Sequence, residues 1–385
     1  MAFTGKTTYA AGDGFPELAE DVSDIVSIVS PYETPLLDAL GDAAHAATSV
    51  RHEWIDAELV PNSGAVDMPG LDDAGGTTVV ISVADATRFL AGDVLQAPDY
   101  KECMLVASVD AGASTITLQR GYGGTAAAAL HDRDVLRIIS HAGLEGEDAP
   151  PPRYTTRARQ FNYTQIFTAT LQVSGTEAAV RHVAVEDEVD FQKSCRLREM
   201  LRDLENTVIN GISNAALPQG SPTVRRTLRG IIASLRTHAF APGDTGFPEG
   251  TALTEEFLNS ALRRIWEDAG SKVDLIVCGG AQKRRINGFI ATNQRFSAAG
   301  ETYKSLVSSY ESDFGVCRVV LSRFVPTDAV LLLDAGRIDV VPLIGRSFQF
   351  QLLAAQGDYH QAELVGEYTL ELRNEPAHGM IRGLS

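Results

Sequence analysis

The sequence contains few cysteines and no long apolar run. Its 385 residues include four Cys with no C-x-x-C pair, so neither a disulfide framework nor a zinc ribbon is expected. The best apolar run covers residues 329–333, whereas a membrane helix needs about 20 apolar residues. The first residues, MAFTGK, lack the apolar region of a secretory signal. These absences predict no membrane partner and free thiols in a reducing compartment, at Cys103, Cys195, Cys278 and Cys317.

Basic residues are also scarce. The chain has 33 Lys and Arg against 50 Asp and Glu, which gives a formal net charge of -17. Nucleic-acid binders usually present a basic surface to phosphates, so the chain as a whole is expected to repel nucleic acid. Residues 1–60 carry 2 basic and 11 acidic side chains, whereas residues 146–240 carry 12 and 10. This asymmetry fits either subunits that lie across one another or a scattered solubilising surface.

The remaining composition is typical of a folded protein with two or three domains, since 44% of the residues are apolar and 22% are charged. Residues 1–45 are polar and turn-rich, which predicts an extended arm with one or two short helices. Residues 50–60 and 153–167 predict the two strands of a long hairpin. Between them, β-rich runs separated by turn residues predict a small all-β domain over residues 71–140.

The second half of the chain mixes helical and strand patterns. Leucine and valine recur at spacings of four, three and four from Leu197 to Val208, which predicts a long amphipathic helix within residues 176–212. Residues 228–350 alternate between helical and strand patterns, and residues 362–373 predict a long strand. The fold class expected from these patterns is α+β.

Nucleotide-binding motifs are incomplete. Gly5-Lys6-Thr7 resembles the end of a phosphate loop, but the earlier glycine and the preceding strand are missing. Gly121-x-Gly123-x-x-Ala126 fits the dinucleotide fingerprint formally, yet too few residues follow it to form the helix that the fingerprint requires. We therefore interpret this second motif as a tight turn within the β domain.

Metal-binding and hydrolytic motifs are incomplete as well. His52-Glu53 begins an H-E-x-x-H pattern, but Asp56 stands at the position of the second His, and no two of the eight His are three or four residues apart. The G-x-S-x-G motif of serine hydrolases is absent. Four carboxylates in the β region offer oxygens to Ca²⁺ at a spacing that matches no calcium loop: Asp93, Asp99, Asp132 and Asp134. We expect no catalytic residue, no cofactor and no metal site.

Arginine and aromatic residues alternate in the second hairpin strand. Residues two apart on a strand share one face, so Arg157, Arg159, Phe161 and Tyr163 are expected to lie together. Such a face could stack on single-stranded nucleic acid, but the acidic surroundings favour contact with another subunit. The candidate intersubunit contact residues are Trp54, Arg153, Arg157, Arg159, Phe161 and Tyr163.

Six short segments, spread in order over most of the chain, resemble a known family. They are DVSDIVSIVSPYETPLLDAL (21–40), HEWIDAEL (52–59), NYTQIF (162–167), VSGT (173–176), RDLE (202–205) and VGEYTLELRNEPAHG (365–379). In these segments the chain resembles the major capsid (major head) proteins of tailed bacteriophages with the Hong Kong 97-type fold. The resemblance implies an N-terminal arm (1–49), an extended loop (50–165) that contains the inserted β domain (71–140), a peripheral domain with a spine helix (166–227), an axial domain (228–350) and C-terminal return strands of the peripheral domain (351–385).

The resemblance also implies a structural role without enzymatic activity. The subunit would be made in the host cytoplasm and would assemble into the pentamers and hexamers of an icosahedral virion head around double-stranded DNA. Implied partners are further copies of the chain, a minor capsid, scaffold or decoration protein, the portal protein, and packaged DNA bound without sequence specificity. Some relatives crosslink a loop Lys to a neighbouring chain, but no motif around Lys101 supports this reaction, and we do not predict it.

Two other functions stay open at this point. One is a cellular encapsulating shell of the same fold, and the other is an enzyme that acts on polysaccharide, with the β domain as its binding module. The enzyme would need two close carboxylates with separated pKa values in a cleft.

Overall fold

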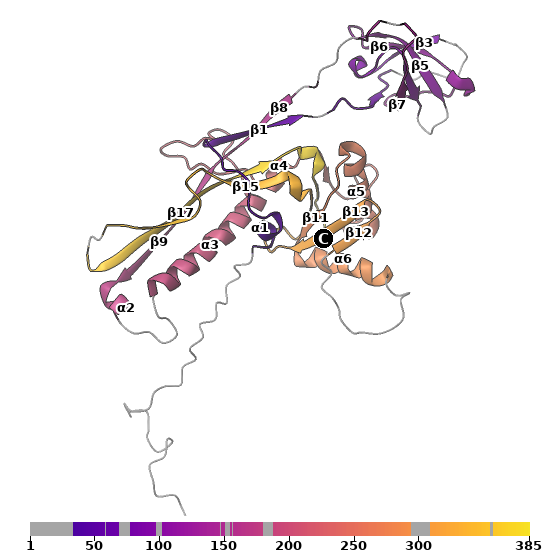
Figure 1. The fold of residues 1–385 in the computed structure, drawn as a ribbon. Helices are drawn as coiled ribbons and strands as arrows, with labels where there is room; N and C mark the ends of the chain where they lie inside the picture. Colours follow the sequence, from indigo (N-terminus) through magenta and orange to yellow (C-terminus); the bar gives the residue numbers. More distant parts are fainter. Residues whose placement is uncertain are drawn as a thin grey trace, which may run out of the picture. The chain divides into compact units, whose positions relative to one another are not determined.

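The computed structural model describes residues 34–57, 59–68, 78–97, 102–146, 148–150, 155, 157–179, 188–293, 309–354 and 357–385. The chain divides into two compact units (Figure 1): Met1–Ile55 with Arg159–Ser385, and Asp56–Ala158. Several sequence predictions fall outside the described residues, namely the arm up to residue 33, the Gly5-Lys6-Thr7 motif, Asp99, Lys101 and Arg153.

The smaller unit is a six-stranded antiparallel sheet with the strand order β2-β7-β4-β5-β6-β3. An isolated bridge between Val66 and Val83, directly after the two edge strands, joins these edges and curls the sheet into a small barrel. Alternate side chains of its strands, such as Met104 and Leu118, are fully buried inside. The strands are β2 (Ser63–Ala65), β3 (Thr78–Ser82), β4 (Asp93–Gln96), β5 (Cys103–Asp110), β6 (Thr115–Gln119) and β7 (Val135–His141), and the 3-10 turns are η3 (Ala86–Arg88) and η5 (Tyr122–Gly124).

A buried ion pair holds the turn after β6. Arg120 Nε lies 2.9 Å from Glu102 Oε1, and the backbone N–H groups of Gly121 and Ala128 each donate to the Glu102 carboxylate at 3.0 Å. Burial alone would raise the pKa of Glu102, but these hydrogen bonds lower it overall. Gly121 has a φ of 65° and begins a single 3-10 turn, so the segment that fits the dinucleotide fingerprint is a tight turn, as predicted.

The larger unit contains a mixed six-stranded sheet in the order β10-β18-β14-β11-β13-β12. The central strands are buried at every residue, as expected for a sheet covered on both faces. Helix α5 begins where Thr254 accepts a hydrogen bond from the Phe257 N–H, and it ends at Gly270, which has a φ of 59°. The elements are β10 (Ala239–Phe240), α5 (Glu255–Ala269), β11 (Leu275–Cys278), α6 (Gly280–Asn293), β12 (Ser309–Ser312), β13 (Gly315–Leu321), β14 (Val330–Leu333) and β18 (Gly379–Ile381).

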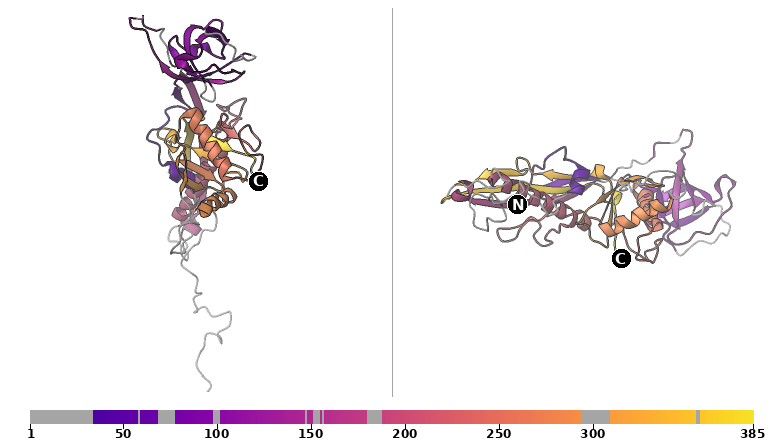
Figure 2. Two further views of the ribbon diagram at one scale, coloured as in Figure 1. Left: turned by 90° about the vertical axis from the view of Figure 1, so that its right-hand side faces the viewer. Right: turned by 90° about the horizontal axis from the view of Figure 1, so that it is seen from below.

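A second sheet of the larger unit is built around the long strand β17, which pairs with β9 over ten residues. Helix α3 packs along β9, and the two lie side by side in Figure 1 and in the view from below in Figure 2. Leu204 and Val208 of α3 share one hydrophobic core with Leu364 of β17 and Leu331 of the first sheet. The elements are β9 (Gln165–Ser174), α2 (Gly175–Ala179), α3 (Glu188–Asn210), α4 (Ile231–Ser234), η7 (Ala335–Arg337), β15 (Ile338–Pro342), β16 (Gln349–Leu352), β17 (Tyr359–Leu372) and η8 (Glu375–Ala377).

The element boundaries differ in places from those expected. The helical pattern within residues 176–212 corresponds to α2 and the longer α3, and residues 180–187 between them are outside the described range. Strand β15 pairs with β17 although it lies within the expected axial region. Strand β18 pairs with β14 in the six-stranded sheet of the larger unit, although it lies within the expected C-terminal return strands. The small unit is also longer than residues 71–140. Strand partners are distant in sequence, so hydrophobic alternation does not reveal them.

Candidate assembly interface

Strands β1 (Arg51–Ala57) and β8 (Arg157–Tyr163) pair as an isolated two-stranded sheet, here called the ribbon. Two-stranded sheets are marginally stable alone because they bury little apolar surface. The ribbon leaves large apolar side chains in contact with solvent, including Ile55 at 64% exposure and Phe161 at 37%. Exposed apolar residues on a two-stranded sheet that is only marginally stable alone are typical of a protein–protein contact.

One face of the ribbon combines charged and aromatic side chains. The Arg51 guanidinium lies over the Phe161 ring at 4.1 Å from its centroid, and Phe161 meets Tyr163 edge to face at 5.8 Å. Glu53 lies 2.8 Å from Arg51 Nε and 3.4 Å from an Arg159 nitrogen, so it bridges the two strands. This face offers arginine and aromatic side chains, which are residue types enriched in protein–protein interfaces.

The structure brings together only some of the predicted contact residues. Arg159, Phe161 and Tyr163 lie on the face described above, although Tyr163 is buried rather than available for contact. Arg157 is exposed. Trp54 lies on the other side of β1, beside His52 with 6.0 Å between the ring centroids, and its indole Nε1 is buried without a hydrogen-bond partner.

Buried polar residues at the base of the ribbon were not predicted as functional. The Asn162 amide donates to the carbonyl oxygens of Arg229 and Leu370, each at 2.9 Å, and accepts from the backbone N–H groups of Tyr163 and Arg229. Asn162 therefore fixes the end of β8 to β17 and to the segment before α4. The signal was a polar residue within a run of β-formers, NYTQIF.

A second polar cluster lies next to Asn162. The Thr164 hydroxyl donates to Glu367 at 2.6 Å, and Glu367 also meets Arg226 at 2.6 Å and Arg346 at 2.8 Å. Burial of the Glu367 carboxylate costs desolvation free energy, and pairing with two guanidinium groups offsets this cost. Together with Asn162, this cluster anchors the chain where it leaves the body of the larger unit.

The segment that precedes the ribbon is also tied to the body. Helix α1 (Pro35–Leu40) starts at Glu205 of α3, whose carboxylate accepts the N–H groups of Leu36 and Leu37, and Leu36 is fully buried. Burial raises the pKa of Glu205 despite these hydrogen bonds and a third from Ser322. Further along, Ala47 bridges to Leu343 beside β15.

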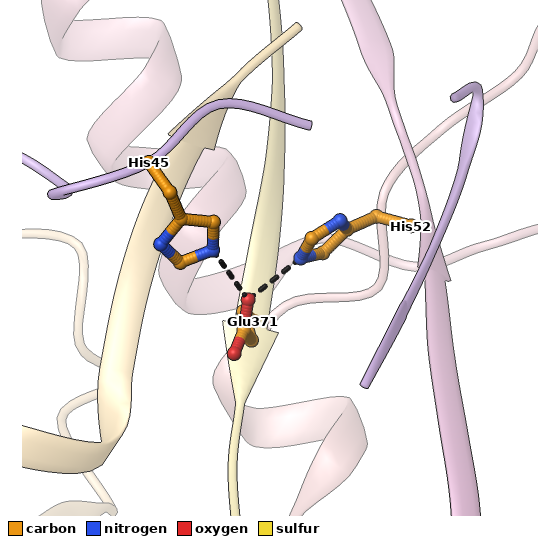
Figure 3. A group of neighbouring side chains, drawn as sticks. All are labelled: His45, His52 and Glu371. Atoms are coloured by element: carbon orange, nitrogen blue, oxygen red, sulfur yellow. Dashed lines mark hydrogen bonds and ion pairs between the residues drawn. The ribbon is translucent and has the colours of Figure 1, made fainter. Parts of the chain in front are cut away.

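Residues with metal-ligand chemistry gather at one place in the described part of the larger unit. The imidazole nitrogens of His45 and His52 both approach the Glu371 carboxylate (Figure 3). The carboxylates considered for calcium in the smaller unit are used differently. Asp93 accepts from the Leu90 N–H and meets His141, and Asp134 accepts from the His131 N–H.

Comparison with known proteins identifies what this arrangement belongs to. The sequence profile described as "SU10 major capsid protein" matches residues 2–385. The chain belongs to the SU10 major capsid protein family. Its role is therefore that of a structural capsid subunit of a phage virion, and the predicted relation to phage major head proteins is confirmed. No curated protein sequence is significantly similar to it.

Solved structures show that this SU10-family protein has the capsid fold over nearly its whole length. The capsid chain of the empty GTA particle computed with C5 symmetry has 9% identity and a TM-score of 0.56, with 99% of this chain and 100% of that chain covered. The capsid chain of the native GTA particle has 9% identity and a TM-score of 0.53, with 100% of both chains covered. The matched chain of Microbacterium phage Oxtober96 has 14% identity and a TM-score of 0.50, with 95% of both chains covered.

These matches confirm the α+β, Hong Kong 97-like fold class expected from the sequence. The family assignment favours a phage head over a cellular shell. Within the described residues, no helix of this SU10-family protein is both long enough and apolar enough to cross a membrane.

Proposed function

We propose that this protein is the subunit that forms the icosahedral shell of a phage head as pentamers and hexamers around double-stranded DNA. The observation that carries the proposal is the ribbon, an isolated pair of strands with exposed apolar side chains, in a chain of the SU10 major capsid protein family. It acts as a building block without catalysis and is made in the host cytoplasm.

The ribbon face supplies contacts between neighbouring copies in this proposal. Arg157, Arg159 and Phe161 meet the next subunit. Arg153 and Trp54 remain further predicted contact residues, although Trp54 lies on the other side of β1. Identical chains in heterologous contact close into rings when the rotation permits, which produces pentamers and hexamers from one subunit. Many interfaces of moderate size then stabilise the shell although no single contact is tight.

The parts of the chain take the roles that the sequence implied. Residues 1–49 act as the N-terminal arm and residues 50–165 as the extended loop with its β domain. The sheet of β17, with β15 and helix α3, forms the peripheral domain, and the sheet of β11, with β18 and helix α5, forms the axial domain. Scaffold, decoration, minor capsid and portal proteins are further partners, and the net charge of -17 keeps packaged DNA from binding tightly to the shell.

Electron microscopy of the purified full-length protein tests this function. We expect closed particles or capsomer rings, formed by the protein alone or after co-expression with its phage partners. A uniform monomer under all of these conditions would contradict the proposal. Turnover of a polysaccharide by the monomer would instead favour the enzymatic alternative.

A matched pair of variants tests the ribbon as the contact. Phe161→Asp places a charge on the proposed contact face and should abolish particles while the circular dichroism of the protein is unchanged. Val135→Asp alters a residue of similar exposure, 56% against 37%, on strand β7 of the smaller unit and should leave assembly intact. Equal loss of assembly in both variants would mean that the ribbon has no special role.

A further inference from the structure

Three side chains from separate parts of the larger unit converge on one point (Figure 3). His45 comes from the loop after α1, His52 from β1 and Glu371 from β17. The His45 Nε2 lies 3.0 Å from Glu371 Oε2, and the His52 Nε2 lies 2.6 Å from the same oxygen. All three potential ligand atoms lie within 4.8 Å of one another.

The donor set is one that zinc prefers. Two imidazole nitrogens and one carboxylate oxygen form a common three-residue zinc site in proteins, with a water as the fourth ligand. Both imidazoles point their Nε2 atoms inward, so each ring can present a ligand without rotating. Imidazole and carboxylate donors also suit other first-row divalent ions, but zinc has the least demanding geometry among them.

A cation that would not compete for the metal lies near the carboxylate. Arg373 Nε lies 3.6 Å from Glu371 Oε1, the oxygen that neither histidine approaches. Oε2 is therefore left to the two imidazoles.

Exposure at the site allows an ion to enter. The side chains of Glu371 and His52 are only 6% and 12% exposed, whereas the His45 side chain is 44% exposed. The buried pair supplies a fixed base, and the exposed histidine closes the site from the solvent side. A water would take the fourth coordination position, as in other zinc sites with three protein ligands.

Only small movements are needed to admit the ion. With bonds of about 2.0–2.1 Å, ligands of a tetrahedral site are about 3.4 Å apart. The two short N–O distances must therefore lengthen by less than about 1 Å, and the two Nε2 atoms, which lie within 4.8 Å of each other, must come closer by at most about 1.4 Å. The backbone near His45 belongs to a loop, which can accommodate such a shift more easily than β1 or β17.

We propose that His45, His52 and Glu371 bind one zinc ion, which fastens the segment after α1 and the start of the ribbon to β17. This inference goes beyond the capsid role and does not depend on it. The ion joins residues that are up to 326 positions apart in the chain, so binding stabilises the folded arrangement. Without a metal, the same three residues form a triad held only by hydrogen bonds. The experiment below distinguishes this hydrogen-bonded triad from a zinc site.

Zinc titration of the metal-free full-length protein is the test. We expect retention of about one zinc per chain after gel filtration, measured by mass spectrometry of the metal, and a rise in the thermal unfolding midpoint that EDTA reverses. His45→Ala and His52→Ala should each reduce affinity by at least about tenfold. His360→Ala is the control, because His360 is an exposed histidine of the same strand β17 that lies outside the cluster.

Glu371→Gln separates metal binding from hydrogen bonding. The glutamine carbonyl can still accept from both imidazoles, but it is a poor zinc ligand, so the zinc-dependent rise of the midpoint should disappear while the midpoint without metal changes little. The proposal is overturned if wild-type protein retains no more zinc than the double variant His45→Ala/His52→Ala. It is equally overturned if zinc leaves the wild-type midpoint unchanged.

Discussion

The carboxylate of Glu205 accepts the backbone N–H of Leu36 at 3.1 Å, across 169 positions of sequence. The first N–H groups of a helix have no partner within the helix, and Thr34, at the cap position of α1, forms no side-chain cap. A residue of the spine helix α3 therefore caps the short helix that precedes the ribbon. The start of α1 is thereby fixed to α3 in the larger unit.

Removal of this cap should destabilise the larger unit. Glu205→Ala leaves the N–H groups of Leu36 and Leu37 and the Ser322 hydroxyl unpaired in a buried position, which we expect to cost on the order of 3 kcal/mol. Glu205→Gln keeps an acceptor for the N–H groups and should cost less than about 1 kcal/mol. Urea unfolding monitored by fluorescence measures both. Equal losses in the two variants would show that charge, rather than hydrogen bonding, provides the stabilisation.

The raised pKa of Glu205 predicts a pH dependence of the opposite sign to that of most carboxylates. Because the folded state holds the proton more tightly than the unfolded chain, stability should fall as the pH rises from about 4.5, the ordinary value, through the raised pKa. At pH values above the raised pKa, this loss of folding stability is complete and no longer changes with pH. Glu205→Gln should remove this slope from unfolding free energies measured between pH 4 and 7. An identical slope in the variant would assign the dependence to another group.

His378 predicts a dependence with the reverse sign. Its Nδ1 accepts the Asp334 N–H at 3.1 Å and its Nε2 donates to the Arg373 carbonyl at 3.2 Å, so the neutral ring is fully paired. Burial lowers its pKa to about 4, and the unfolded chain therefore takes up the proton first. Stability present above pH 6.5 should be lost as the pH falls toward 4, by on the order of 3 kcal/mol.

The measurement for His378 is urea unfolding at closely spaced pH values, compared with His378→Asn. The asparagine variant is less stable at neutral pH because it cannot pair with both backbone groups, but its profile should be flatter between pH 6.5 and 4. His131→Asn alters an exposed histidine, with a side chain 75% exposed, and should retain the wild-type slope. A slope that survives in His378→Asn refutes the assignment.

Sequence patterns predicted elements whose signal is local. The leucine repeat of α3 and the alternation of β17 were both recognisable because one face of each element is buried. The capping of α1 by Glu205 was not recognisable, since a glutamate in a helix carries no mark of a partner 169 positions away. The cluster of His45, His52 and Glu371 was not recognisable either, because Glu371 lies more than 300 positions from both histidines and the three meet only in the folded chain.

The face of the ribbon was predictable in part. The period of two in β8 correctly placed Arg159 and Phe161 together. It could not indicate that Tyr163 is buried where β8 meets the body, or that Trp54 lies on the other side of β1, because both depend on which strand pairs with which.

Breaking the buried ion pair of the smaller unit should cost more than removing it entirely. Arg120→Met leaves the Glu102 carboxylate buried without its cation, and we expect a loss of about 3–5 kcal/mol. The double variant Glu102→Met/Arg120→Met removes the stranded charge and should lose less than Arg120→Met alone. Differential calorimetry of the full-length chain resolves this. A double variant that loses as much stability as Arg120→Met, or more, would contradict this expectation.

Asn162 links the ribbon to the body, so its truncation should affect stability and assembly together. Asn162→Ala removes two donated and two accepted hydrogen bonds at a side chain that is 4% exposed, which we expect to cost on the order of 3 kcal/mol. Gln160→Ala alters an exposed neighbour on the same strand and should change stability by less than about 0.5 kcal/mol.

Sedimentation of assembled particles then shows what Asn162 contributes beyond stability. If a fixed ribbon base is needed to direct the contact face, particles of Asn162→Ala should be fewer or irregular even at temperatures where the subunit is fully folded. Gln160→Ala should assemble like the wild type. Regular particles formed by a folded Asn162→Ala subunit would mean that contacts in the shell orient the ribbon without this anchor, and that the hydrogen bonds of Asn162 serve only the fold of the single chain.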